Sequence, residues 1–240
     1  MEAIADLTKS PMLEMVPKLE HGFTNLRISR EQATALDSRT ATAKQVHGDK
    51  LVWTDHFEKR EREADGIATF TPHLAVGVYS ADCAPVLTAA LDPGTGFPFA
   101  AMAVHAGWRG TALGIAGNTL REFILECAKK KKGARYVCAI GPCIGPQSFE
   151  VGEDVVSAFP HAEASGLARF LRLEDGKKKY LFDLPGENLR QLHLARKELK
   201  ASVTVDTLGL CTLARKEEFP SFRRDREKAG RILSFLAFSG

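Results

Sequence analysis

The sequence has no long hydrophobic run. No stretch without charged residues approaches the ~20 apolar residues that a membrane-spanning helix requires. The first ten residues include Glu2 and Asp6 and no apolar core, so they lack the pattern of a signal peptide or a membrane anchor. We therefore expect a cytoplasmic protein without a membrane partner.

The sequence also lacks a strong net charge and a disulfide pattern. Its 33 Lys and Arg residues against 30 Asp and Glu residues give a formal net charge of +3, too small to predict a nucleic-acid partner. Four lysines at 129–132 end a helical pattern, where positive charge complements the helix dipole. The five cysteines are an odd number without small-scaffold spacing, so we expect reduced thiols, which again indicates the cytoplasm.

Internal repeats, low-complexity tracts and linkers are absent as well. The 240 residues, of which 44% are hydrophobic, can bury a substantial core and fit one large domain better than two small ones. Strand and helix patterns interleave, so we predict a single mixed α/β domain over residues 1–240, in which segment 1–44 is weakly patterned. Nothing in the sequence requires an oligomer, and it is compatible with a monomer.

Apolar runs, helical spacing and turn residues define the expected elements. Continuous apolar runs predict buried strands at 51–53, 74–91 with a break at 82–85, 99–104, 136–140 and 232–238. Helical spacing predicts helices at about 111–130 and from Pro185 to about 199, with shorter ones at 29–36 and 153–159. A strand or turn is expected at 21–23, a solvated turn or helix end at 58–63, and a surface loop at 177–179.

Three stretches each place one metal-binding side chain beside small or turn-forming residues. His47 lies in residues 45–48, Cys83 in 80–85 and His105 in 103–110. Two imidazoles and one thiol match a catalytic zinc site, which usually has three protein ligands and keeps its fourth position for water or substrate. The intervals of 35 and 21 residues have no general metal-site meaning, and by residue type alone Cys83 could equally be a small buried side chain.

Residues 107–110, Gly-Trp-Arg-Gly, are expected to form the turn from a buried strand into a helix. Unpaired backbone N–H groups and the helix dipole favour an anion at such a position. Arg109 is suited to hold an oxyanion with two hydrogen bonds, although it could equally form a salt bridge that fixes the turn. Trp108 and the more distant Phe149 could stack on a purine or pack in the core.

The other histidines carry less information. His56, His73 and His161 lie in polar or Pro-flanked segments, and His193 lies beside the apolar stripe of its helix. We expect solvated or incidental roles for these four. His21 stands beside a glycine, and the sequence leaves its role open.

Successive motifs along the chain resemble the YfiH family. They cover about residues 45–238 and comprise Gln45-Val46-His47-Gly48, Ala64-Asp65-Gly66, Ser80-Ala81-Asp82-Cys83-Ala84-Pro85-Val86, Val104-His105-Ala106-Gly107-Trp108-Arg109-Gly110, Ile140-Gly141-Pro142 with Glu150-Val151, Phe182-Asp183-Leu184 with Asn188, Cys211-Thr212, and Ser221-Phe222-Arg223-Arg224-Asp225. The resemblance implies a layered α/β sandwich with mixed sheets. It also implies a zinc site whose ligands are His47, Cys83 and His105.

Members of this family are zinc-dependent purine nucleoside phosphorylases that also deaminate adenosine, and they have been described as polyphenol oxidases (laccases) and as peptidoglycan editing factors. The resemblance therefore implies that adenosine, inosine or guanosine reacts with phosphate to give a free base and ribose 1-phosphate. As a hypothesis, zinc would activate water for attack on C6 of adenosine, with Asp82 as a proton shuttle or as a partner that orients an imidazole. Cys83, His105 and Arg109 complete the expected catalytic group.

The sequence departs from the family pattern at two places. After residues 21–23, His-Gly-Phe, it continues as Thr-Asn-Leu-Arg, where relatives carry a longer loop rich in Ser or Thr, Arg and Gly. Segment 1–44 is therefore divergent, and substrate contacts from that loop are in question. The loop that follows Pro142 also differs from that of relatives, and we assign Cys143 no role.

Two other enzyme classes use the same side chains. Two histidines, one cysteine and the nearby Met102 resemble a blue-copper centre, but a laccase needs further copper sites, commonly built from His-x-His pairs, which this sequence lacks. Copper is therefore the weaker candidate. Cys83 as nucleophile with His105 as base would make a thiol hydrolase or amidase, for example one that edits peptidoglycan precursors. A non-enzymatic binding module is the simplest alternative.

Overall fold

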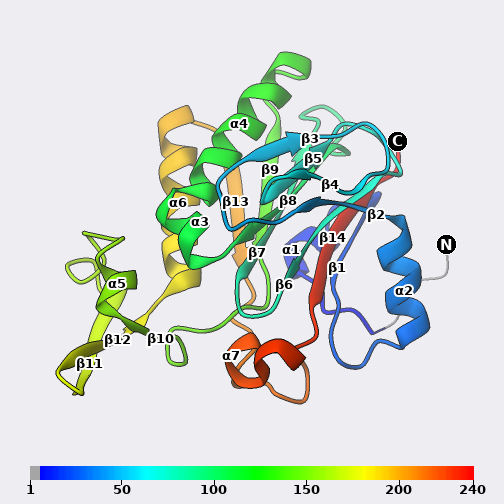
Figure 1. Ribbon diagram of the computed structural model, residues 1–240. Helices are drawn as coiled ribbons and strands as arrows, with labels where there is room; N and C mark the ends of the chain where they lie inside the picture. Colours follow the sequence, from blue (N-terminus) through cyan, green and yellow to red (C-terminus); the bar gives the residue numbers. More distant parts are fainter. Residues whose placement is uncertain (1–5) are drawn as a thin grey trace.

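Three β-sheets and the helices around them form the part of the chain that is described, residues 6–240 of a computed structural model (Figure 1). The strands are β1 (Leu19–Phe23), β2 (Thr40–Lys44), β3 (Leu51–Trp53), β4 (Lys59–Glu63), β5 (Gly66–Thr69), β6 (Ala75–Ser80), β7 (Ala84–Leu91), β8 (Pro98–Ala106), β9 (Arg135–Ile140), β10 (Glu150–Gly152), β11 (Ala168–Glu174), β12 (Lys177–Phe182), β13 (Ser202–Thr207) and β14 (Ile232–Phe238). The helices are α1 (Pro11–Glu14), α2 (Arg30–Arg39), α3 (Trp108–Ala112), α4 (Ile115–Lys130), α5 (Glu153–Val156), α6 (Leu184–Leu199), α7 (Phe222–Asp225) and the 3-10 helix η1 (Arg226–Lys228). Residues 1–5 lie outside the described residues. They include Glu2, one of the two acidic residues on which the prediction about a signal peptide was based.

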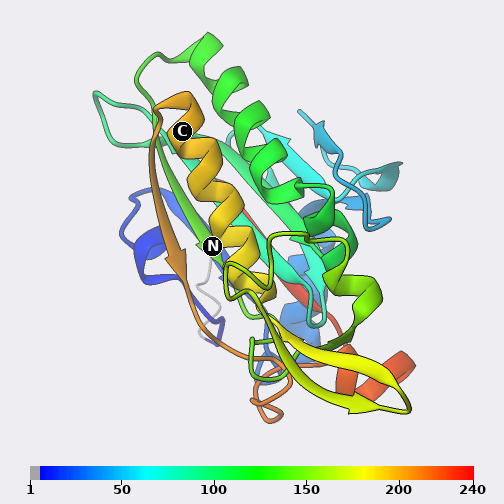
Figure 2. The same cartoon turned by 90° about the vertical axis from the view of Figure 1, so that its left-hand side faces the viewer.

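Four layers stack through the molecule. Helices α4 and α6 lie side by side over one face of the six-stranded sheet, whose order is β13-β9-β7-β8-β5-β3 (Figures 1 and 2). The five-stranded sheet, β1-β14-β6-β2-β4, packs on the opposite face, and α2 covers its outer side. Both sheets contain parallel and antiparallel pairs. This arrangement confirms the predicted layered α/β sandwich with mixed sheets.

Strands β7 and β8 lie at the centre of the six-stranded sheet, and both of their faces are buried. In β8, Ala100, Met102 and Val104 pack under the helices, whereas Ala101 and Ala103 face the five-stranded sheet. Because side chains alternate between the two faces of a strand, a strand that is buried on both faces shows a continuous apolar run. This burial explains why the sequence predicted these strands so clearly.

Two segments that we predicted to be turns or loops are strands. Residues 59–63 form β4, in which four of the five side chains are exposed, and residues 177–179 begin β12. Strand β4 lies at the edge of its sheet, and β12 belongs to a small antiparallel sheet that projects from the body (Figure 2). Charged residues are common on exposed edge strands, so composition alone concealed the pairing.

The predicted start of the helix at about 111–130 is wrong. The chain already forms α3 from Trp108, and α4 begins only at Ile115 because Gly114 adopts a φ of 85° between them. This left-handed conformation favours glycine and interrupts a helix. Arg109 therefore lies in the first turn of α3 rather than in a turn before a helix.

The remaining predicted elements are confirmed to within a few residues. The expected break between strands falls between β6 and β7, and Pro185 occupies the first turn of α6. The polar segment at 29–36 forms α2, where Ser29 caps the helix. Within residues 6–240, no helix is long and apolar enough to cross a membrane.

Candidate functional site

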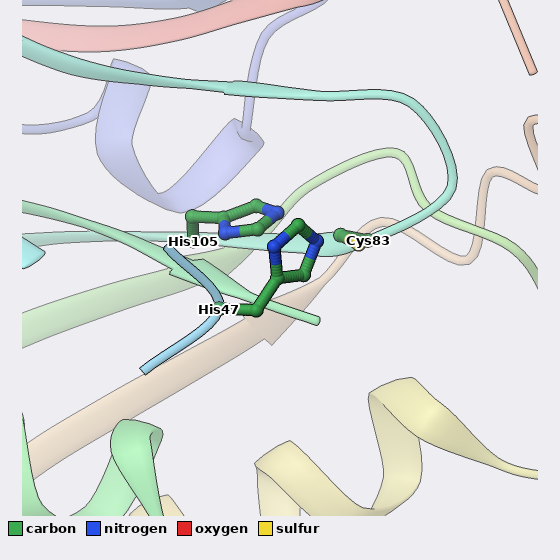
Figure 3. A group of neighbouring side chains, drawn as sticks. All are labelled: His47, Cys83 and His105. Carbon is green, nitrogen blue, oxygen red and sulfur yellow. The ribbon is translucent and has the colours of Figure 1, made fainter. Parts of the chain in front are cut away.

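The three predicted metal ligands come together where β7 begins and β8 ends (Figure 3). His47 lies in the loop between β2 and β3, Cys83 in the turn between β6 and β7, and His105 near the end of β8. Their metal-binding atoms all lie within 4.8 Å of one another, and no other group of this kind occurs within residues 6–240. A tetrahedral zinc ion, with bonds of about 2.1 Å to nitrogen and 2.3 Å to sulfur, places its ligand atoms about 3.5 Å apart. Small side-chain movements would therefore close the set around an ion.

A single buried carboxylate, that of Asp65, positions two of these side chains. It accepts a hydrogen bond from Nδ1 of His105 at 2.8 Å. It also accepts the backbone N–H groups of Val46, His47 and Gly48 at 3.0, 3.0 and 2.8 Å, so the loop wraps around it. Because Nδ1 of His105 donates to the carboxylate, Nε2 is the ring nitrogen available to bind a metal ion.

Gly107 lets the backbone pass close beside the three side chains. A Cβ atom at this position would lie 2.9 Å from Cδ2 of His47 and 3.0 Å from Sγ of Cys83, which is too close for packed atoms. His47 has a φ of 60°, and its ring meets that of His105 edge to face with centroids 4.9 Å apart. Two imidazoles and one thiol held this closely are a donor set that fits a zinc ion.

Electrostatic interactions favour a thiolate beside a protonated imidazole. Burial raises the pKa of the Cys83 thiol, but the charge and hydrogen bonds of His105 and then His47 outweigh burial and lower this pKa to about 6. Burial likewise lowers the pKa of His105, yet Cys83 and Asp65 raise it to about 9. Opposite charges stabilise each other where water is scarce. The thiolate is the form in which cysteine binds a metal ion or acts as a nucleophile.

The carboxylate of Asp82 binds the C-terminal segment of the chain. It accepts hydrogen bonds from Oγ1 of Thr212 at 2.6 Å, from Oγ of Ser221 at 3.0 Å and from the amide of Arg223 at 2.6 Å. Ser221 caps the N-terminus of α7, so Asp82 fixes this short helix beside the turn between β6 and β7. The carboxylate that orients an imidazole is Asp65.

Two adjoining cavities, each of about 480 Å³, reach His47 and Cys83. We call the first the mixed-charge cavity; its charged lining residues are Asp82, Arg109, Glu150, Asp154, Lys179, Arg223 and Arg226. We call the second the basic cavity; its lining includes Lys44, Arg60, Ser80, His105, Arg109 and Arg231, and no acidic residue. The cavities meet at five shared residues, namely His47, Ala81, Cys83, Arg109 and Phe222.

Arg109 is exposed at the junction of the two cavities. Its guanidinium carbon lies 4.5 Å from the centre of the Trp108 ring. Within residues 6–240, no carboxylate forms an ion pair with Arg109, so the alternative of a salt bridge that fixes the turn is not seen. Trp108 and Phe149 both line the mixed-charge cavity, and Phe149 also packs against Phe182 in the core.

The other histidines lie away from these three side chains. Three of the four that we expected to be solvated are exposed, namely His56, His73 and His193. The fourth, His161, instead contacts the buried carboxylate of Glu187 at 2.9 Å. His21 is buried, and its Nε2 accepts a hydrogen bond from the amide of Ser10 at 3.0 Å. Both therefore have structural partners.

Sequence reasoning did not identify two features of the site. Asp65 lies in the Ala64-Asp65-Gly66 motif of the sequence, but its contact with His105, 40 residues away, has no sequence signal. Arg223 of α7 and Arg226 of η1 line the mixed-charge cavity, more than 100 residues beyond His105 in the sequence. A run of arginines near the C-terminus indicates an anion site only when the fold places it beside other functional groups.

Known proteins resemble this chain in sequence and structure. The model of the family described as multi-copper polyphenol oxidoreductase laccase matches residues 19–239. The purine nucleoside phosphorylase YfiH of Escherichia coli (strain K12) is 33% identical over 204 residues, which cover 84% of this chain and 74% of that protein. The protein of the same name from Shigella flexneri is 34% identical over 204 residues, with the same two shares.

Solved structures show the same fold. The YfiH protein of Bacillus licheniformis aligns with a TM-score of 0.72 at 24% identity, over 94% of this chain and 95% of that one. The protein YlmD of Geobacillus stearothermophilus aligns with a TM-score of 0.69 at 24% identity, over 94% and 93%. Together with the match over residues 19–239, these relatives show that the chain belongs to the YfiH family.

Proposed function

We propose that the protein is a zinc-dependent purine nucleoside phosphorylase that also deaminates adenosine. Adenosine, inosine or guanosine would react with phosphate to give a free base and ribose 1-phosphate. The observation that carries the proposal is the convergence of His47, Cys83 and His105. All three line the basic cavity, and His47 and Cys83 also line the mixed-charge cavity. The names of the relatives, which are purine nucleoside phosphorylases, support the choice of reaction.

The size and walls of the mixed-charge cavity suit a nucleoside. Its volume of about 480 Å³ lies in the range of small-molecule sites, which is about 300 to 1,000 Å³. Trp108 and Phe149 offer aromatic surfaces on which a purine can stack. Charged residues around these rings provide hydrogen bonds for ribose hydroxyl groups.

The donor set supports zinc as the metal. His47, Cys83 and His105 supply three ligands and leave a fourth position open, as in catalytic zinc sites. A bound zinc ion supplies a Lewis acid that polarises an oxygen atom and makes water acidic enough to lose a proton near neutral pH. Asp65 orients His105 and holds the loop of His47, so this carboxylate determines whether the ligands converge.

In phosphorolysis, a phosphate oxygen forms a bond to C1′ of the ribose while the bond from C1′ to the base nitrogen breaks. The base leaves as the neutral heterocycle after taking up one proton, and the attacking hydrogen phosphate loses one proton as it becomes the ribose 1-phosphate dianion. Arg109 stands at the junction of the cavities without a carboxylate partner among residues 6–240, and its guanidinium can hold phosphate through two hydrogen bonds. In deamination, water replaces the C6 amino group of adenosine, and ammonia is released.

For Asp82 we propose a positioning role. All three of its hydrogen-bond donors belong to the C-terminal segment, and α7 carries Phe222 and Arg223 into the wall of the mixed-charge cavity. The proton-shuttle role expected from the sequence stays a prediction, and it would require the carboxylate to leave at least one of these donors.

A second candidate function has a specific observation in its favour. Cys83, with its lowered pKa, lies beside His105. A thiol nucleophile and its base have the same arrangement in thiol hydrolases. A thiol hydrolase or amidase would use the same pair without a metal ion. The family description names copper instead, and a polyphenol oxidase would carry that metal.

One experiment separates these functions. The protein is purified without added metal, its metal content is measured, and the products from adenosine and inosine are analysed with and without phosphate. We expect about one zinc ion per chain and ribose 1-phosphate only when phosphate is present. Base release at an unchanged rate without phosphate would indicate hydrolysis. Copper would support the oxidase, and a metal-free protein with amidase activity would support the thiol hydrolase.

A further inference from the structure

We propose that the basic cavity is a binding site for a phosphate group. This inference deepens the proposed function, because it places the anionic co-substrate in a cavity different from that of the nucleoside. Four cationic side chains line the basic cavity, namely Lys44, Arg60, Arg109 and Arg231. The mixed-charge cavity, by contrast, also contains the carboxylates of Asp82, Glu150 and Asp154, which repel a dianion.

Three of the four cations of the basic cavity form no direct ion pair with a carboxylate within residues 6–240, although the charge of Arg60 acts on Asp37 and lowers the pKa of that carboxyl group. Within residues 6–240, neither Arg60 nor Arg231 forms an ion pair with a carboxylate. Lys44 is the exception, since its Nζ lies 2.8 Å from Oε1 of Glu63. Cations gathered in a concave surface repel one another and concentrate anions. A dianion in this cavity would relieve that repulsion.

Two of these arginines are held by neighbouring groups. The guanidinium of Arg60 lies 5.0 Å from the centre of the Tyr79 ring, and Arg60 has a φ of 57°. One guanidinium nitrogen of Arg231 donates to the carbonyl groups of Ala229 and Gly230 at 3.0 and 3.1 Å. In each case other guanidinium N–H groups stay available for a ligand, and a guanidinium is the side-chain group best matched to phosphate oxygens.

Ser80 provides an independent observation. Ser80 is one of the residues that line the basic cavity, and it is only 2% exposed. Its Oγ has no hydrogen-bond partner among residues 6–240. Ser80 ends β6 and pairs with Ile232 of β14, so its backbone is fixed. A buried hydroxyl group without a partner is unfavourable. The Oγ atom lies beneath the cavity surface, so a phosphate oxygen would accept its hydrogen bond after a rotation of the Ser80 side chain.

The position of the basic cavity fits the chemistry of phosphorolysis. A nucleophile that displaces a base attacks C1′ from the side opposite to the leaving base. The two cavities meet at Cys83 and Arg109. Phosphate in the basic cavity and the base in the mixed-charge cavity would therefore face the ribose from different sides.

Titration calorimetry of the purified metal-loaded protein tests the site, with inorganic phosphate in one arm and adenosine 5′-monophosphate in the other. The variants are Arg60→Gln, Arg231→Gln and their combination. Arg27→Gln is the matched control, because Arg27 is exposed and lies outside both cavities. Each cavity variant is expected to weaken phosphate binding about tenfold or more, since a charge-assisted hydrogen bond is lost. The control should bind as the wild type does, and Ser80→Ala should weaken binding in the same direction.

The two arms identify the source of the phosphate group. If inorganic phosphate binds and the arginine variants weaken its binding, the basic cavity is the site of the co-substrate. If only the nucleotide binds in this way, the cavity is still a phosphate site, but its ligand is a phosphate ester. If neither ligand binds the wild type, or if the double variant binds both as tightly as the wild type, the inference is wrong. Phosphorolysis with an unchanged KM for phosphate in the double variant would overturn the site but not the proposed function. Arginine-dependent phosphate binding without phosphorolysis would support the site and contradict the proposed function.

Discussion

Asp65 and His105 are joined twice, through a side-chain hydrogen bond of 2.8 Å to Nδ1 and a backbone hydrogen bond of 2.7 Å from the His105 amide to the Asp65 carbonyl. The same carboxylate gathers three backbone N–H groups of the loop that carries His47. One residue immediately before β5 therefore sets the relative position of two candidate ligands that are 58 positions apart in the sequence.

This relationship predicts a strong effect of Asp65→Asn on metal binding. An asparagine side chain keeps the size of aspartate but cannot accept all four N–H groups or carry the negative charge. We expect zinc affinity to fall about 10- to 100-fold, measured by competition with a chromophoric chelator. Asp55→Asn is the control because Asp55 is exposed and belongs neither to the ligand set nor to the lining of either cavity. Equal affinities of Asp65→Asn and the wild type would contradict the assigned role.

Gly107→Ala tests the close packing around the ligands. The new Cβ atom would lie closer to His47 and Cys83 than van der Waals contact allows. We therefore expect the free energy of unfolding to fall by about 1 to 3 kcal/mol and the affinity for zinc to fall. Thermal unfolding with and without zinc measures both effects. Gly230→Ala, where the nearest atom lies at an ordinary 3.6 Å, should leave both unchanged. A fully zinc-binding Gly107→Ala variant would show that the backbone is not confined there.

The role of Asp82 is separable by kinetics. If Asp82 anchors α7, Asp82→Asn raises the KM for the nucleoside because the cavity wall shifts, and Thr212→Val changes KM in the same direction by removing one of the same hydrogen bonds. A proton shuttle predicts otherwise: Asp82→Asn would lower kcat at constant KM, and Thr212→Val would resemble the wild type. Steady-state measurements on both variants decide between the two roles.

Much of the fold could be predicted because burial leaves a pattern in the sequence. Strands β7 and β8, buried on both faces, show continuous apolar runs, and α6 shows helical spacing. Strand β4 could not be predicted, because its exposed side chains carry no periodic signal and its pairing with β2 is made by the backbone. The break at Gly114, which has a φ of 85°, was missed because the apolar residues on both sides of it continue a helical spacing.

The candidate site divides in the same way. His47, Cys83 and His105 were found because their residue types and flanking motifs carry a chemical signal, and the fold brings them together. Asp65 was missed because aspartate is common and only its contacts distinguish it. Ser80 was missed because serine is common and only its buried hydroxyl group without a partner, within residues 6–240, distinguishes it. Such contacts between distant segments are a property of the folded chain.

His21 gives a prediction for stability against pH. Burial and then the charge of Lys9 lower its pKa from 6.5 to about 4, and Nε2 must stay unprotonated to accept the amide of Ser10. Between these pH values the unfolded chain binds a proton that the folded chain does not. Stability is therefore fully present above pH 6.5 and falls as the pH drops toward 4, by up to about 3 kcal/mol.

Denaturant unfolding at several pH values between 4 and 7 measures this loss. In His21→Gln the glutamine can still accept the amide hydrogen bond but does not titrate, so the decline in stability on acidification should become smaller. The difference between the two proteins isolates the contribution of His21 from that of carboxylates. Parallel curves for wild type and variant would show that His21 is not the group responsible.

The central claim is that His47, Cys83 and His105 hold a zinc ion on which nucleoside turnover depends. The most direct test is to measure zinc per chain and phosphate-dependent inosine cleavage together in the wild type, Cys83→Ala and Cys138→Ala, the last being a buried thiol outside the site. We predict about one zinc ion per chain and cleavage in the wild type and in Cys138→Ala, and the loss of both in Cys83→Ala. Retention of zinc and of cleavage by Cys83→Ala would contradict the account.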